Sequence, residues 1–286
     1  MKLKLIAAAA VLAASGAQAA ITTPAGGNSD MIATFYSASQ NATFTVDLGI
    51  TMSQFTSSVS ASATGIKLVW DLDASTFSDL SATSTGLSTQ ALNYGNVFTN
   101  FYTAPVAGAS DLKFAVMAAD GSPTIGISNN RGILVSAASD ATVSANNSAI
   151  LNASGTAGMQ PYMTAANGDT TNSTQGSAAA GANMLDSGDA TNVNFVTGLG
   201  DNVKAYLPFN ITGADESALS FYALTTTSAT GTAAGTVVKY SGAWSFDAAT
   251  NSLIYQTAPV PEPETYAMLL AGLGLMGAVA RRRRQA

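Results

Sequence analysis

The chain has 286 residues, of which 10% are charged and none is Cys or His. Without these two residue types, disulfide bridges, cysteine and serine-triad proteases, imidazole acid-base catalysis and most zinc sites are excluded. Between residues 21 and 258, five basic residues stand against fifteen acidic ones, whereas nucleic-acid binding requires a basic surface. We therefore expect no nucleic-acid partner, no enzymatic activity and no cofactor.

Residues 1–19 have the three parts of a secretory signal peptide. A start with two lysines is followed by ten apolar residues, and the small residues Ala17 and Ala19 flank a position suited to signal peptidase. We expect this helix to direct the chain to the Sec export machinery and to be removed, so that the mature protein begins at Ala20.

The body, residues 20–258, repeatedly alternates apolar and polar residues with a period of two, which is typical of half-buried strands. Phe44, Val46 and Leu48 follow this pattern, with polar residues between them. It predicts further strands over 66–72, 112–116, 203–209, 219–224, 236–240, 244–246 and 253–255. Each strand should have one solvated face, and a turn at 247–251 should join the last two in a meander.

Residues 137–192 differ from the rest of the body because Ala, Ser, Thr, Asn and Gly dominate them. Such a composition offers little apolar surface to offset the entropy of ordering the chain. We expect a low-complexity region of long loops there, in which a short strand at 149–152 and a boundary between two domains stay open as alternatives.

No long segment with the 3.6-residue period of a helix occurs outside the two termini. The expected fold class is therefore all-β, with an antiparallel β-sandwich as the first architecture and a jelly-roll-like body as the second, both with long polar loops.

Two kinds of side chain in the body are candidates for ligand binding. Asp71 and Asp73, with Asp79 nearby, are weak candidates for a cation site because residues i and i+2 of a strand point the same way, and a solvated strand face is the simpler interpretation. Trp70 and Trp244 could stack on sugars if they were exposed, but Trp70 shares its face with three aliphatic residues, which favours the core.

The last 28 residues, 259–286, contain three segments in a fixed order. Pro261, Glu262 and Pro263 lie in a proline-rich stretch that should be extended. An uncharged, mostly apolar segment over 266–280 follows, about 22 Å long as a helix and thus a short transmembrane span. The basic cluster at the end should keep this terminus in the cytoplasm, so that the body lies outside; its members are Arg281, Arg282, Arg283 and Arg284.

These three segments resemble the PEP-CTERM sorting signal of Gram-negative bacteria. The resemblance covers about the last 27 residues and implies recognition by exosortase, a membrane-embedded protease that releases or transfers the protein. It also implies a producing cell that makes exopolysaccharide. We accordingly expect transient anchoring in the inner membrane and final placement at the cell surface or outside the cell.

The resemblance identifies the export route, whereas the role of the body has to be inferred from its composition. The leading hypothesis is a structural or adhesive component of an exopolysaccharide-associated biofilm or floc, with extracellular polysaccharide as a partner. A secreted carbohydrate-binding module is the alternative, and it requires exposed aromatic side chains. A secreted hydrolase based on carboxylates is the third, and it requires Asp side chains that converge in one cleft.

Overall fold

The computed structural model describes residues 21–37, 42–92, 94, 97–102, 112–121, 131–155, 158–168, 182–185, 207, 209–214, 217–228 and 231–258. The helices in these ranges are η1 (Pro24–Gly26), α2 (Met52–Ser58), α3 (Val97–Phe101), α5 (Asn147–Ser154) and α6 (Met159–Gly168). The strands are β1 (Asp30–Ser37), β2 (Ala42–Thr51), β3 (Lys67–Asp71), β4 (Thr76–Asp79), β5 (Gln90–Ala91), β6 (Lys113–Asp120), β7 (Gly132–Ala138), β8 (Ala182–Leu185), β9 (Gly213–Ala214), β10 (Leu219–Thr225), β11 (Thr236–Asp247) and β12 (Ser252–Gln256).

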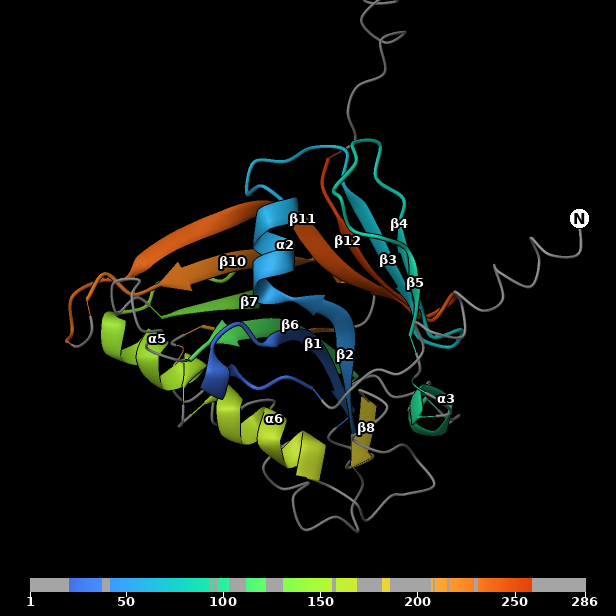
Figure 1. Cartoon of the computed structure of the whole chain (residues 1–286), viewed down its shortest axis with the longest axis horizontal. Helices are drawn as coiled ribbons and strands as arrows, with labels where there is room; N and C mark the ends of the chain where they lie inside the picture. The colour runs from blue at the N-terminus through green and yellow to red at the C-terminus, as the bar shows by residue number, and fades with distance from the viewer. Residues whose placement is uncertain are drawn as a thin grey trace, which may run out of the picture.

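The described strands form one antiparallel sheet in the order β5-β4-β3-β12-β11-β10-β7-β6-β1-β2-β8, with β9 paired to β6 (Figure 1). The prediction of a predominantly β, antiparallel body is confirmed, although a few helices accompany the sheet. The two separate sheets of a sandwich or jelly roll are not what the described residues show, because hydrogen bonds connect every one of these strands into a single sheet. A sheet of this many strands accumulates twist, and here it curls into a half-barrel.

The curl brings strands that are distant in the sheet order into contact across its concave face. The indole N–H of Trp70 in β3 donates to the carbonyl of Leu48 in β2 at 2.8 Å. Phe35 of β1 and Phe246 of β11 meet edge to face with ring centroids 5.0 Å apart. An aromatic core thus fills the interior of one curled sheet, whereas in a sandwich such a core lies between two facing sheets.

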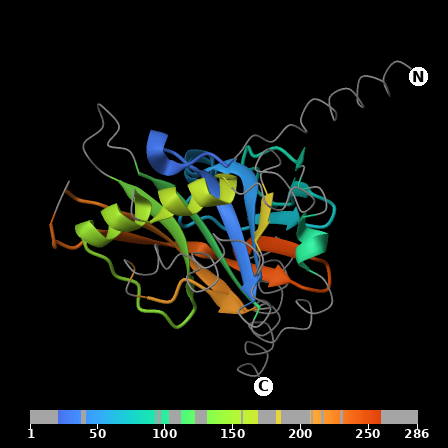
Figure 2. The ribbon, with the colours of Figure 1, turned by 90° about the horizontal axis from the view of Figure 1, so that it is seen from below.

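Helices cover both faces of the sheet. The side chain of Phe55 in α2 enters the core on the concave face, where its ring lies 5.5 Å from that of Phe221. On the other face, α5 and α6 cover a second apolar cluster that includes Ile133, Tyr162 and Met163 (Figures 1 and 2). The core is therefore divided into two layers by the sheet itself.

The prediction of one solvated face per strand is wrong for β2 and also for β6, in which residues 114–119 are all buried. Thr43, Thr45 and Asp47 are 1%, 2% and 5% exposed, although they alternate with the apolar residues as a solvated face would. The phenol of Tyr162 in α6 lies 3.0 Å from the hydroxyl of Thr45 and donates to that of Thr34 at 2.8 Å. Tyr162 of α6 thereby satisfies the buried hydroxyls of Thr34 and Thr45, whereas the buried hydroxyl of Thr43 has no hydrogen-bond partner among the described residues. In β3, by contrast, buried and half-buried residues alternate as predicted.

The prediction of loops over 137–192 is wrong for α5 and α6, and residues 149–152 lie in a helix. Asn146 caps α5 by accepting a hydrogen bond from the backbone N–H of Ala149 at 2.8 Å. In α6, buried residues recur with helical spacing at Met159, Tyr162, Met163 and Ala166. Both helices are short and contain few large apolar residues, so a scan for long segments with a helical apolar period does not detect them.

The predicted meander at the end of the body is confirmed. Strand β10 pairs with β11, and β11 pairs with β12 through a turn in which Asp247 is opposite Ser252. The segments 236–240 and 244–246 belong to one continuous strand rather than two. Most of the predicted strand over 203–209 lies outside the described residues.

Candidate functional site

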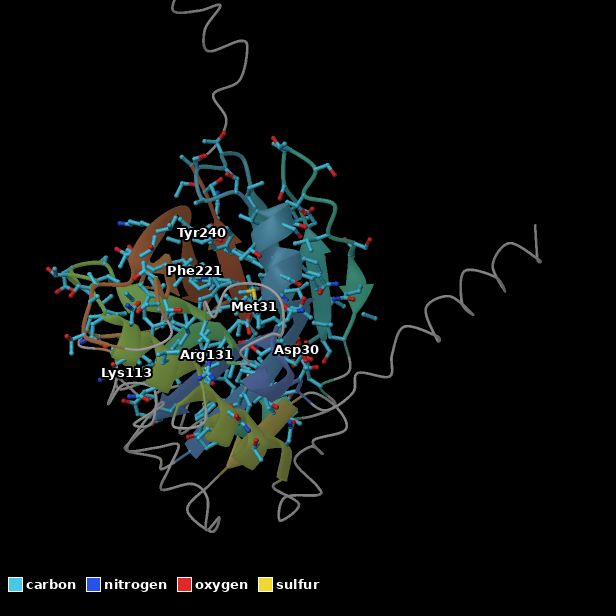
Figure 3. All side chains as sticks on the ribbon, turned by 60° about the vertical axis from the view of Figure 1, so that its left-hand side comes forward. Asp30, Met31, Lys113, Arg131, Phe221 and Tyr240 are labelled. Atoms are coloured by element: carbon cyan, nitrogen blue, oxygen red, sulfur yellow. The ribbon has the colours of Figure 1, made fainter. Side chains whose placement is uncertain are left out.

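The described part of the chain brings two carboxyl groups together on the face covered by α6. Asp30 begins β1 (Figure 3), and Asp47 follows in β2 beside a register shift between the two strands. Gly49 has a φ of +71° there, and its N–H donates to the Asp47 carboxyl at 2.7 Å. The Asp30 carboxylate accepts a hydrogen bond of 2.6 Å from the N–H of Thr22. Backbone N–H groups thus fix both acids: that of Thr22, near the start of the body, binds Asp30, and that of Gly49 binds Asp47.

Burial makes Asp47 an unusual acid. Desolvation, reinforced by the negative charge of Asp30, raises the pKa of Asp47 to about 8. The same burial, with Asp47 nearby, raises the pKa of Tyr94, whose hydroxyl donates to the carbonyl of Asp47 at 2.7 Å. At neutral pH the Asp30 and Asp47 pair therefore holds a proton. No sequence pattern identified this pair, because Asp47 occupies a position that alternation assigns to solvent.

The two tryptophans predicted as core or sugar-stacking residues are both core. Trp70 and Trp244 are 0% exposed, and their rings lie 5.2 Å apart. Neither ring face is available to a ligand, which confirms the core interpretation that the apolar neighbours of Trp70 favoured.

The weak cation candidates Asp71 and Asp73 make different contacts in the structure. Asp71 ends β3 and accepts hydrogen bonds from the backbone N–H groups of Asp73 and Ala74, whereas Asp73 lies in the turn and accepts one from Thr99. They do not share a strand face, because β3 ends between them. Within the described ranges, no three acidic side chains gather in a group that could hold a metal ion.

Asp79 shows the opposite electrostatic behaviour to Asp47. Partial burial acts to raise its pKa, but hydrogen bonds from Ser81 and Thr85 outweigh this effect and lower the pKa below its usual value. Its carboxylate accepts from the Thr85 hydroxyl at 2.6 Å and from the Ser81 N–H at 3.0 Å. Asp79 therefore stabilises the loop that follows β4 as an ionised group.

The sequence-predicted export and sorting residues lie outside the described residues. They are Ala17 and Ala19 of the signal peptide, Pro261, Glu262 and Pro263, the segment 266–280, and Arg281, Arg282, Arg283 and Arg284. Among the helices that the structure describes, none combines the length and the apolar character needed to cross a membrane.

The structure does define the point from which the C-terminal segment departs. The N–H of Thr257 donates to the carbonyl of Ile66 at 3.0 Å, and the carbonyl of Ala258 accepts from Gly65 at 2.9 Å. These bonds extend the pairing of β12 with β3 up to the last described residue. The segment that starts at residue 259 is thus attached to the ordered sheet without an intervening linker.

Comparison with known proteins assigns this C-terminal segment. Residues 259–284 match the family model of the PEP-CTERM protein-sorting motif. Neither the curated proteins nor the solved structures give a match to the chain. The motif implies an exported protein that carries a membrane-anchoring sorting signal at its C-terminus and is processed by exosortase in the membrane. The chain is therefore a PEP-CTERM sorting domain-containing protein.

Proposed function

We propose that this protein is a structural or adhesive component of an extracellular matrix, in which it supports an exopolysaccharide-associated biofilm or floc. The signal peptide directs it through the Sec machinery, the C-terminal helix anchors it transiently in the inner membrane, and exosortase releases it. The match of residues 259–284 to a sorting motif is the observation that carries this proposal.

The body supports a non-enzymatic role. Its acidic pair includes Asp47, which is 5% exposed, and a group so buried cannot contact a polymeric substrate. Asp71 and Asp79 accept hydrogen bonds from their own turns. A hydrolase based on two carboxylates would need a pair placed around a substrate.

The same structure argues against the hypothesis that the body is a carbohydrate-binding module. That hypothesis depended on Trp70 and Trp244, and both rings are buried. In the described ranges, the exposed large hydrophobic residues are the aliphatic side chains of Leu80, Val237 and Val238. None of them supplies the aromatic face on which a sugar ring stacks.

The route is tested by mass spectrometry of the C-terminal peptide of the protein recovered from culture medium. Cells with the exosortase-type protease should release a form that ends near Pro261, and cells without it should retain the arginine-terminated chain in the membrane. Glu262→Ala, in the Pro261-Glu262-Pro263 triplet, should reduce release, whereas Glu264→Ala, which lies in the matched segment but outside the triplet, serves as the matched control. Retention of the intact chain in both strains would show that the C-terminal segment serves only as a membrane anchor and is not processed.

The matrix role requires a separate experiment. Cells lacking this protein should form flocs that settle more slowly and a biofilm that retains less polysaccharide, and added secreted protein should restore both. The secreted protein should also sediment with the cells' own isolated exopolysaccharide. Unchanged flocs together with no co-sedimentation would contradict the matrix role and leave the export route intact.

A further inference from the structure

The N-terminal half of β11 is an open sheet edge in the described structure. Its residues 236–239 pair with β10 on one side, but β12 pairs only with residues 243–247 of the same strand. Thr236 to Lys239 are all exposed, Val237 by 37% and Val238 by 41%. Figure 1 shows this part of β11 along the border of the sheet. An unprotected edge of this kind accepts another strand.

The hydrogen bonds determine which backbone groups this edge offers. The N–H of Thr226 donates to Arg131 at 2.9 Å, so even-numbered residues of β10 face β7 and odd-numbered ones face β11. Since Ala223 is opposite Val238, the backbone of Val238 faces β10. Val237 and Lys239 therefore direct their N–H and C=O groups outward.

The C-terminal segment starts next to this edge. A single loop over residues 60–65 binds both places: Gly65 donates to the carbonyl of Ala258, while the carbonyls of Ala61 and Ala63 accept from Ser241. Ser241 lies two residues beyond Lys239 in β11. The described chain thus ends beside the open edge, with residues 259–265 still to follow before the apolar segment.

The residues that follow have the chemistry of a one-sided strand. Prolines occupy 259, 261 and 263, so only Val260, Glu262 and Glu264 have an N–H. Alternate residues of a strand direct their backbone groups to opposite edges, and proline is tolerated where no N–H is needed. An extended segment 259–264 can therefore pair along one edge only.

The residues of 259–264 that have an N–H are the even-numbered ones, and these are also the residues whose backbone groups would face β11. Thr257 donates to Ile66, which lies on the β3 side, so odd-numbered residues of β12 face β3 and even-numbered ones face β11. The three prolines continue the odd series, which faces away from β11. The residues with an N–H continue the series that faces it.

We propose that the open edge of β11 binds residues 261–264 of its own chain as an added antiparallel strand, with Glu262 opposite Lys239. The loop at 60–65 lies between Ala258 and Ser241. The proposed register therefore allows the chain two more residues to pass this loop than a direct continuation of the β11–β12 pairing would. A shift of two residues leaves the even-numbered residues facing β11. This register places a carboxylate opposite the ammonium of Lys239. It also places Pro263 opposite the exposed side chain of Val238.

The proposal gives the body a role in sorting, and it rests on the route proposed above, in which the tag stays attached until a protease cuts it. A motif held against β11 is withheld from the membrane protease, which must take the same segment from the edge. The folded body thereby sets how readily its own tag is processed.

The absence of cysteine from the chain permits a clean test by disulfide trapping. Val238→Cys combined with Pro263→Cys places two thiols at a pair of facing residues without mutual hydrogen bonds, where the Cα atoms of an antiparallel ladder approach to about 4.5 Å, within the range of a disulfide. The full chain would be purified with its tag, in detergent, from cells lacking the protease, reduced and then oxidised. Leu80→Cys with Pro263→Cys is the control, because Leu80 is 59% exposed and lies away from β11.

The expected result is an intramolecular disulfide between positions 238 and 263, identified as a linked peptide by mass spectrometry. Its yield should exceed that of the disulfide in the control variant. Equal trapping in both pairs would overturn the proposal. Links between molecules alone would also overturn it, because a second copy would then occupy the edge.

A kinetic measurement tests the consequence and separates the two proposals. In cells with the protease, Lys239→Glu should speed release of the tag by about twofold, the factor that corresponds to the loss of one cross-strand charge pair, and Leu80→Glu should not. Unchanged release in Lys239→Glu would contradict the proposed edge contact. Absence of processing in the unaltered chain would instead contradict the sorting route.

Discussion

The side-chain amide of Asn167 binds both backbone groups of Ile21. Its oxygen accepts from the Ile21 N–H at 2.9 Å, and its nitrogen donates to the Ile21 carbonyl at 2.7 Å. Ile21 is 3% exposed and belongs to the apolar cluster beneath α6. One residue at the end of α6 therefore secures the segment that, by the sequence prediction, follows the signal-peptide cleavage site.

Asn167→Ala should destabilise the secreted protein. It removes two hydrogen bonds to a buried residue, and about 1–3 kcal/mol of unfolding free energy should be lost. Urea unfolding followed by circular dichroism measures this change. Asn210→Ala is the control, since Asn210 is exposed and its side chain accepts from Thr212 nearby; an equal loss in both variants would contradict a special role for Asn167.

The buried carboxyl pair should make the protein less stable as pH rises. Because the pKa of Asp47 is about 8 in the folded protein and near 3.8 in the unfolded chain, the folded form holds one proton more between these values. The free energy of unfolding should then fall with a slope approaching 1.4 kcal/mol per pH unit for one proton. Urea midpoints measured from pH 5 to pH 8 give this slope.

Asp47→Asn should remove most of that slope and raise stability at pH 8, because the amide resembles the protonated acid and can still accept from Gly49. Asp79→Asn should leave the slope unchanged, since the lowered pKa of Asp79 keeps it ionised in both states across this window. A slope in Asp47→Asn equal to that of the unaltered protein would refute the assignment.

The two buried tryptophans offer a matched comparison of one hydrogen bond. Trp70→Phe removes the indole that donates to Leu48, whereas the indole nitrogen of Trp244 has no hydrogen-bond partner in the structure. Both changes remove a similar volume of buried ring. Trp70→Phe should therefore cost about 1–3 kcal/mol more than Trp244→Phe, and equal losses in urea unfolding would show that the bond across the curl adds nothing.

The capping box of α2 should stabilise the aromatic core indirectly. Thr51 accepts from the N–H of Gln54, and Gln54 accepts from the N–H of Thr51 at 2.7 Å. Thr51→Val should lower the free energy of unfolding by about 1 kcal/mol, as the loss of such a cap does elsewhere, because α2 carries Phe55. Thr56→Val, at an exposed site in the same helix, should have a much smaller effect in the same unfolding assay.

The sequence predicted those strands whose side chains face unlike surroundings. Trp70 and its neighbours in β3 alternate between buried and half-buried positions, and the pattern is readable because solvent contacts one side. In β2 the polar residues Thr45 and Asp47 are buried as well, because Tyr162 of α6 lies against Thr45 and Asp47 lies beside Asp30. Alternation alone cannot distinguish a solvated face from one satisfied by a helix that is distant in the chain.

The functional residues likewise fall into those that local sequence predicts and those that only the fold brings together. The C-terminal sorting segment depends on local order, with Pro261, Glu262 and Pro263 ahead of an apolar run and four arginines, so the sequence alone determined it. The meeting of Asp30 with Asp47, the burial of Trp244, the curling of one sheet and the open edge at Val238 depend on which strands pair. Only the tertiary structure decided these, because strand pairing joins residues far apart in the chain, and the free energy of that pairing comes from contacts that no local window contains.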